Sequence, residues 1–302
     1  MAIQDYWDLT DRPHTERKLR ILKQYLYPWA NIIFNQWKKY GWDDYGTVYY
    51  IDCFAGRGKY HKDGRQDSVD GSPIIALKCA EYFQNKYKNA VKLRCIFVEE
   101  KKKNITDLKK FSHEFVKKGI EFRIYHNDVN KEIKSILDII KSHASFFFID
   151  PCRLKQLDCE TVKMIVNKKG PNDIILNYIC GTKRVIEWIK KRIATREKKE
   201  TTIKLIESIA GFHTLDVLKE SLEASDRDRL RLWAENVFKE TALKYKALYE
   251  MISSSKNEPV YYLLFASRRP IAKKIMIHIF NKEDRTTYSG QQKLFSNNNF
   301  DF

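Results

Sequence analysis

Acidic residues follow four expected strands, at the point where each strand ends. They are Asp52, Glu99, Asp128 and Asp150. Carboxylates accept hydrogen bonds and balance positive charge, so together they suit a ligand with a cationic group, a ribose and an exocyclic amine. A single strand-end aspartate can also be a simple turn residue. The argument for a ligand therefore depends on all four lying at one edge of one sheet.

A glycine-containing turn directly follows the first of these strands, with the sequence DCFAGRG over residues 52–58. Glycines there let the backbone approach a ligand closely. The turn is not a P-loop, which would need glycine in place of Cys53 and Ser or Thr in place of Tyr60. It is not the dinucleotide motif either, because His61 stands at the third glycine position. With the four acids, it indicates S-adenosylmethionine.

Short apolar runs that alternate with helical patterns must position these residues. The runs that indicate strands are 48–51, 93–98, 121–126, 145–150 and 173–180. The helical patterns cover 14–39, a segment starting at Ser72, 102–118, 130–142 and 160–169. This alternation predicts an α/β fold with a doubly wound, mostly parallel, Rossmann-like sheet that has helices on both faces.

The alternation of strand and helix patterns ends after residue 182. Residues 183–258 are charged and helical in pattern, so we expect a helical insertion or lid. Strands at 260–267 and 274–280 are joined by a short connection and should pair antiparallel. We therefore divide the chain into a methyltransferase-like core with its leading helix (1–182), the insertion (183–258), a strand pair completing the sheet (259–285) and a tail (286–302).

Composition limits the classes of partner. The 56 Lys and Arg outnumber the 39 Asp and Glu, so the net charge is +17, which attracts phosphate backbones. No apolar stretch is long enough for a membrane span, and no signal peptide is visible. The six cysteines form no C-x-x-C pair, and the histidines lack metal-ligand spacing. We expect a cytoplasmic protein with reduced thiols, no membrane association and no metal.

The stretch D-x-F-A-G-x-G resembles the first motif of the class I S-adenosylmethionine-dependent methyltransferases. The resemblance implies that Asp52 and the turn hold the methionine end of the cofactor. It implies that Glu99 binds the ribose hydroxyls and Asp128 the adenine amine. The turn residues concerned are Phe54, Ala55, Gly56 and Gly58.

The chain is more closely similar to the three-Cys-motif partner family. This resemblance covers most of residues 15–280 and depends on the stretches ILKQYLYPW, YIDCFAGRGKY, DGSPIIAL, FFFIDP and YYLLFAS. It implies a second protein as a possible partner. The cysteines in the family name belong to that partner, so those of this chain are not the motif.

The residues after the fourth strand would form the catalytic motif, and they depart from both families. Methyltransferases that act on base amines resemble [DN]-P-P-[YF], whereas this chain has Asp150, Pro151, Cys152 and Arg153. The three-Cys-motif partner pattern is closer to Asp-Pro-Phe-Gly. Cys152 is either a small pocket-lining residue or a nucleophile, as in pyrimidine C5-methyltransferases.

The sequence favours a methyltransferase that acts on DNA or RNA at an exocyclic base amine, with Asp150 accepting a hydrogen bond from that amine. Tyr178 could stack on a base, and Lys183 and Arg184 could contact phosphates. Three alternatives stay open. They are a C5-methyltransferase that uses Cys152, a non-catalytic partner protein with this fold, and a nuclease-like component of a defence system. For the nuclease, the sequence shows no carboxylate cluster beyond the strand ends.

Overall fold

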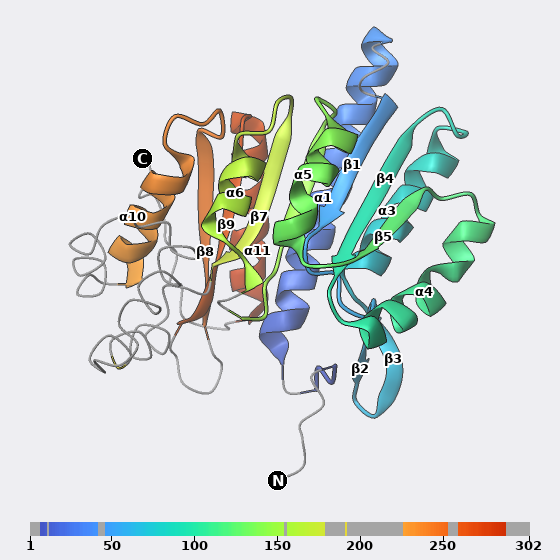
Figure 1. Cartoon of the computed structure of the whole chain (residues 1–302), viewed down its shortest axis with the longest axis horizontal. Coiled ribbons are helices and arrows are strands. Elements are labelled where there is room, and N and C mark those ends of the chain that lie inside the picture. The colour runs from blue at the N-terminus through green and yellow to red at the C-terminus, as the bar shows by residue number, and fades with distance from the viewer. Residues whose placement is uncertain are drawn as a thin grey trace.

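The computed structural model describes residues 7–10, 12–41, 46–153, 156–178, 191, 226–252 and 259–287. Its helices are α1 (Pro13–Tyr40), α3 (Ser72–Lys86), α4 (Lys102–Lys117), α5 (Val129–Ile140), α6 (Cys159–Val166), α10 (Asp226–Phe238) and α11 (Pro270–Thr287). Its strands are β1 (Thr47–Asp52), β2 (Lys59–Lys62), β3 (Arg65–Asp70), β4 (Lys92–Glu99), β5 (Phe122–His126), β6 (Ser145–Ile149), β7 (Asn172–Tyr178), β8 (Tyr245–Ile252) and β9 (Pro259–Ser267). Figure 1 shows one large sheet with helices on both faces.

The large sheet has seven strands in the order β5-β4-β1-β6-β7-β9-β8. Neighbours from β5 to β7 pair parallel, and β9 pairs antiparallel with both β7 and β8. The chain builds outward from β1 through β4 and β5, and then returns to the other side of β1 with β6 and β7. The predicted fold class is confirmed, and the strand order reverses between β1 and β6.

Two apolar layers hold this sheet between its helices. Side chains of α1, α3, α4 and α11 form one layer, and those of α5, α6 and α10 form the other. The central strand β6 supplies both, since Phe146 and Phe148 join the first layer and Phe147 and Ile149 the second. Burial on both faces explains why this strand is a continuous apolar run rather than an alternating one.

Helix α1 brings its first turns to the carboxyl ends of the parallel strands (Figure 1). Pro13 stands at its start, where a missing amide hydrogen costs nothing. Gly41 ends it in the left-handed conformation, with φ of 65°, and its N–H donates to the Trp37 carbonyl at 2.8 Å. The sequence pattern placed both ends of this helix within one residue of where they lie.

The polar segment after the first strand is a hairpin and not an open loop. Strands β2 and β3 pair antiparallel and are joined through Asp63 and Gly64, both with positive φ. The segment before α1 also adds to this hairpin, because the Leu9 N–H donates to the His61 carbonyl and the His61 N–H donates to the Trp7 carbonyl. The segment before α1 is thereby attached to the hairpin that follows the glycine turn.

Two predictions for the last third of the chain are wrong. Residues 245–252 are strand β8, where we expected helix, because the inward positions Ala247, Tyr249 and Met251 alternate. Residues 274–280 belong to helix α11, where we expected a strand. The alternating isoleucines suggested a strand, but burial falls at helical spacing on Ala272, Met276, Ile279, Phe280 and Glu283.

The strand pair at the end of the sheet is therefore β8 with β9, and not 260–267 with 274–280. In the predicted insertion, α10 is helical as expected. Residues 183–190, 192–225 and 253–258 lie outside the described residues, as does the tail from residue 288.

Candidate functional site

The four predicted acids lie at the carboxyl ends of adjacent parallel strands. Asp52 ends β1 and Glu99 ends β4, while Asp150 directly follows β6 and Asp128 lies two residues after β5. In open α/β sheets, ligands bind outside these strand ends, where the strand order reverses. Asp52 and Asp150 stand on the two strands that flank this reversal. The expectation that the acids share one edge is confirmed.

Asp52 lies beneath the glycine turn and shapes it. Its carboxylate is fully buried and accepts hydrogen bonds from the Phe54 N–H and the Tyr50 hydroxyl, each at 3.2 Å. Burial raises the pKa of Asp52 to about 7, although hydrogen bonds from Ser72 and the Phe54 N–H act in the opposite direction. The Asp150 carboxylate raises this pKa further. Asp52 therefore holds the turn in place, and its predicted contact with a cofactor stays a prediction.

The glycine turn needs its glycines because Gly56 and Gly58 have φ of 65° and 94°. The Gly56 N–H donates to Glu99 Oε2 at 2.9 Å, and the Ala55 N–H donates to the Val98 carbonyl at 2.9 Å. These bonds attach the turn to β4. Ala55 is buried and Phe54 is half-buried at this edge.

Glu99 is the acid that reaches from β4 to the turn. Besides the Gly56 N–H, it accepts hydrogen bonds on Oε1 from the Lys101 N–H at 2.8 Å and from Asn104 Nδ2 at 3.1 Å. A carboxylate has about four acceptor positions. Three are used by these contacts, so the half-exposed Glu99 can take one more donor, such as a hydroxyl.

Asp128 acts as the amino-terminal cap of α5. Its Oδ1 accepts from both the Asn130 N–H and Asn130 Nδ2, each at 2.9 Å. This is the turn role that a strand-end aspartate commonly has. A ligand contact through Asp128 stays a prediction.

Asp150 is bound by two side chains that the sequence did not connect with it. Lys18 Nζ lies 2.5 Å from Oδ2, and Asn177 Nδ2 donates to Oδ1 at 2.7 Å. Lys18 extends from α1, and its side chain is only 10% exposed. Burial lowers the pKa of Lys18, but Asp150 and Tyr261 outweigh this and raise it above its ordinary value. Asn177 Oδ1 is buried without a hydrogen-bond donor.

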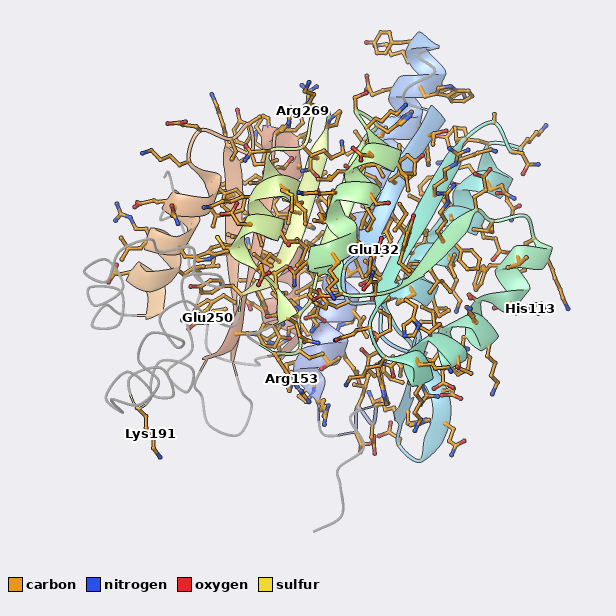
Figure 2. All side chains as sticks on the ribbon, viewed as in Figure 1. His113, Glu132, Arg153, Lys191, Glu250 and Arg269 are labelled. Atoms are coloured by element: carbon orange, nitrogen blue, oxygen red, sulfur yellow. The ribbon has the colours of Figure 1, made fainter. Side chains whose placement is uncertain are left out.

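Two hydrogen bonds hold the backbone of Cys152 and Arg153 after Asp150. Gln156 Oε1 accepts from the N–H groups of Cys152 and Arg153, both at 2.9 Å. Pro151 is buried, whereas Cys152 is exposed and Arg153 lies at the solvent side of this edge (Figure 2). Cys152 is therefore exposed to solvent, two residues after Asp150.

The predicted nucleic-acid contacts do not form a surface in the described residues. Tyr178 is buried, 3% exposed, and its ring packs on Trp233 with 4.8 Å between centroids. This placement contradicts a base-stacking role, because the ring is a core element between β7 and α10. Lys183 and Arg184 lie outside the described residues.

Two aromatic residues that the sequence reading missed as site residues adjoin the turn. Trp7 contacts Gly56, and Tyr60 lies beside Trp7 with 5.2 Å between ring centroids. Burial raises the pKa of Tyr60, Lys18 lowers it, and Asp150 and Cys152 raise it, with a net shift upward. From the sequence, Tyr60 was informative only because its position excludes a P-loop. Nothing in the sequence places Trp7 beside residue 56.

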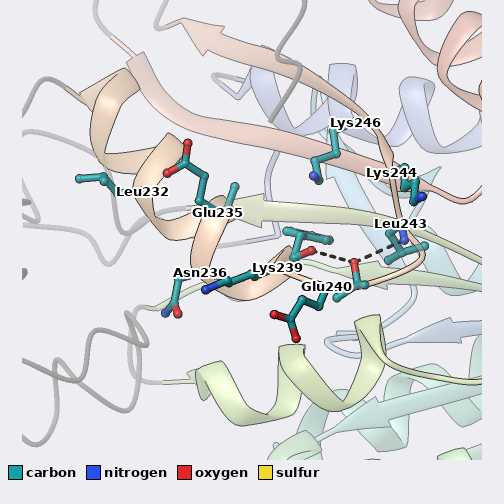
Figure 3. A pocket seen from close by; sticks show the side chains of 11 residues that line it. Leu232, Glu235, Asn236, Lys239, Glu240, Leu243, Lys244 and Lys246 are labelled. Carbon is teal, nitrogen blue, oxygen red and sulfur yellow. Dashed lines mark hydrogen bonds between the residues drawn. The ribbon is translucent and has the colours of Figure 1, made fainter.

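A pocket of about 800 Å³ lies elsewhere, between the end of α10 and the start of β8 (Figure 3). Lys239, Lys244 and Lys246 line it together with Glu235 and Glu240. It contains none of the predicted site residues, and it lies at the sheet edge opposite the four acids.

In the part of the chain that the structure describes, no group of three or more His, Cys, Asp or Glu side chains is arranged to hold a metal ion. None of the described helices combines the length and apolarity that crossing a membrane requires.

No protein-family model matches the chain, and no curated protein matches it. Among solved structures, it is similar to a geranyl diphosphate methyltransferase in complex with geranyl diphosphate and sinefungin, with 12% identity, a TM-score of 0.35 and coverage of 74% of this chain and 73% of the other. It is also similar to an S-adenosylmethionine-dependent methyltransferase from Anabaena variabilis (9% identity, TM-score 0.34, coverage 78% and 82%). An rRNA methylase from Streptococcus thermophilus is a further match (9% identity, TM-score 0.31, coverage 74% and 89%). We base the proposed function on the residues of this chain.

Proposed function

We propose that this chain binds S-adenosylmethionine beside β1 and β4 and transfers its methyl group to an exocyclic amine of a nucleic-acid base. The observation that carries the proposal is the contact between the Gly56 N–H and Glu99 Oε2 at 2.9 Å. It joins a left-handed glycine turn to a carboxylate on the next strand, beside the point where the strand order reverses.

The residues at this edge fit the chemistry of the cofactor. Glu99 has an acceptor position left for a ribose hydroxyl. Asn177 Oδ1 is a buried acceptor that lacks a donor beside Asp150. Such unsatisfied groups are costly, and a donor from a ligand would satisfy this one.

When bound, S-adenosylmethionine supplies a methyl group on a sulfonium, which an amine lone pair takes as the S–C bonding electrons return to sulfur. Asp150 would accept a hydrogen bond from that amine and then its proton. Lys18 and Asn177 occupy one position on each Asp150 oxygen, so the carboxylate still has acceptor capacity. These two side chains would fix its orientation. The net charge of +17 supports a nucleic-acid substrate.

The test is calorimetry with S-adenosylmethionine and S-adenosylhomocysteine on wild type, Glu99→Gln and Glu100→Gln. We expect wild type to bind and Glu99→Gln to bind roughly tenfold or more weakly, as for a lost hydrogen bond to a charged group. Glu100 is the exposed next residue, so Glu100→Gln should bind as wild type does. Thermal unfolding of both variants checks the fold. Absence of binding to wild type refutes the proposal.

Transfer of a labelled methyl group to DNA, RNA and protein pools then tests the substrate class. Label in a nucleic acid that disappears in Asp150→Asn, under conditions where thermal unfolding shows that the variant is folded, supports the proposed role of Asp150. Label only in protein contradicts a nucleic-acid substrate. Binding without transfer to any pool would favour the non-catalytic partner role, which the altered motif at residues 150–153 leaves open.

One observation supports a second candidate, pyrimidine C5-methylation through Cys152. Of the five cysteines that the structure describes, Cys152 is exposed and the other four are buried. In this reaction its thiolate would bond to C6 of the base, C5 would take the methyl group, and loss of the C5 proton would release the thiol. A covalent adduct with a 5-fluoropyrimidine oligonucleotide, absent in Cys152→Ser, would support it.

A further inference from the structure

Two aromatic rings, those of Trp7 and Tyr60, lie against the glycine turn and the hairpin that follows it. The Trp7 ring contacts Gly56 so closely that a Cβ on this glycine would lie 2.7 Å from Trp7 Cη2. The Tyr60 ring lies beside it, with an interplanar angle of 49°. Burial raises the pKa of Tyr60, and Asp150 and Cys152 are among the groups that raise it further. We refer to Trp7 and Tyr60 as the aromatic wall.

Backbone contacts fix the aromatic wall. The Trp7 carbonyl accepts from the His61 N–H at 2.7 Å, and the Leu9 N–H donates to the His61 carbonyl at 2.9 Å. Trp7 is therefore part of a bridge to the hairpin that also carries Tyr60. On the hairpin side, Gly71 allows Tyr60 to approach, since a Cβ there would lie 3.2 Å from Tyr60 Cε2.

The faces of aromatic rings attract cations, and weakly hydrated cations most readily. Arg57 lies 6.0 Å from the Trp7 ring centroid, but its guanidinium is already paired with Asp67 at 2.9 Å and Asp107 at 3.3 Å. The arginine charge is therefore balanced by two carboxylates. An organic cation bound beside the glycine turn would meet the aromatic wall while the ion pairs of Arg57 stay intact.

We propose that the aromatic wall contacts the sulfonium of S-adenosylmethionine, so that the site prefers this cation to neutral S-adenosylhomocysteine. The inference depends on the proposed function, because it concerns the same site. Transfer of the methyl group leaves an uncharged thioether, so the attraction to the rings is lost in the product. The aromatic wall would thereby favour exchange of product for fresh cofactor.

The experiment measures dissociation constants for S-adenosylmethionine, S-adenosylhomocysteine and sinefungin, which carries an amine in place of the sulfonium methyl. The proteins are wild type, Trp7→Leu, Trp7→Phe and the control Trp37→Leu. Trp37 also contacts a glycine, Gly46, but at the opposite edge of the sheet. Circular dichroism and thermal unfolding accompany each variant.

We expect Trp7→Leu to weaken the two cationic ligands roughly tenfold, as for a desolvated cation–π contact, and the neutral one about twofold or less. Trp7→Phe should reduce the preference for the cation roughly two- to threefold, and Trp37→Leu should leave it unchanged. An equal loss for all three ligands shows that Trp7 only packs on the turn, and overturns the inference. If Trp7→Leu does not fold, an unchanged preference in Trp7→Phe overturns it.

The same measurement separates the two proposals. Failure of wild type to bind any of the three ligands refutes the proposed function and the inference with it. Equal affinity of wild type for the charged and the neutral ligand refutes the aromatic wall alone and leaves the proposed cofactor in place.

Discussion

Replacing the buried Asp52 by asparagine should stabilise the protein at high pH and change little at low pH. Burial raises the pKa of Asp52 to about 7 in the folded state, from an ordinary value of 3.8. Between these values, the folded chain holds a proton that the unfolded chain has released. The free energy of unfolding therefore falls as the pH rises from about 4 to about 7.

The size of the effect follows from this difference. A pKa difference of about three corresponds to roughly 4 kcal/mol, at about 1.4 kcal/mol for each pH decade. Asparagine cannot ionise, yet its amide oxygen can still accept from the Phe54 N–H. Asp52→Asn should thus gain up to about 4 kcal/mol over wild type at pH 8, and close to nothing at pH 4.

The assay is denaturant unfolding of wild type and Asp52→Asn at a series of pH values between 4 and 8. Asp173 titrates in the same range, because burial raises its pKa to about 6. It does so in both proteins, so its contribution cancels in their difference. A stability difference that is the same at all pH values would refute the reasoning, since it would show that Asp52 is ionised to the same degree in both states.

Two further predictions concern the ion pair at the site and a tight turn. Lys18→Met and Asp150→Asn should each lower the unfolding free energy by roughly 3–5 kcal/mol, because each leaves a buried partner without its counter-charge, and the double variant should lose much less than their sum. Additive losses in chemical denaturation would contradict this coupling. Gly170→Ala should cost about 3 kcal/mol or more, because φ is 82° and the new Cβ would lie 2.0 Å from the Ser142 carbonyl oxygen. The matched Gly64→Ala, with φ of 71° and no atom within 4 Å, should cost only about 1–2 kcal/mol, and equal melting temperatures for the two variants would contradict the steric explanation.

The parallel half of the sheet was predictable because each strand is marked locally. An apolar run of five or six residues ends at an acid or a turn, and a helical pattern follows, as from Val48 to Asp52. The last third of the chain has no such apolar runs that end at an acid or a turn and lead into a helical pattern. In α11, Ile275, Ile277 and Ile279 alternate as in a strand, although Ile277 is 39% exposed and only the helix explains the buried Glu283. Periodicity over seven residues could not separate the two structures.

The candidate site was predictable only in its strand-end residues. Asp52, Glu99 and Asp150 follow from the rule that parallel strands end at one edge. Lys18 and Trp7 reach the same edge from before the first strand, and their contacts with Asp150 and Gly56 depend on how α1 packs under the sheet. Such contacts join segments that are far apart in the chain, so they produce no spacing pattern that could be recognised in the sequence.

The insertion of β9 between β7 and β8 has a consequence for synthesis on the ribosome. All of residues 179–258 must be made after β7 before its antiparallel neighbour exists. At a synthesis rate of roughly 5–20 residues per second, this edge of β7 stays unpaired for several seconds. During that time its unpaired backbone groups can form hydrogen bonds with other nascent chains, and the apolar side chains of Ile174–Leu176 can contact them. Productive folding of this chain should therefore depend on chaperones that shield one sheet edge until β9 emerges.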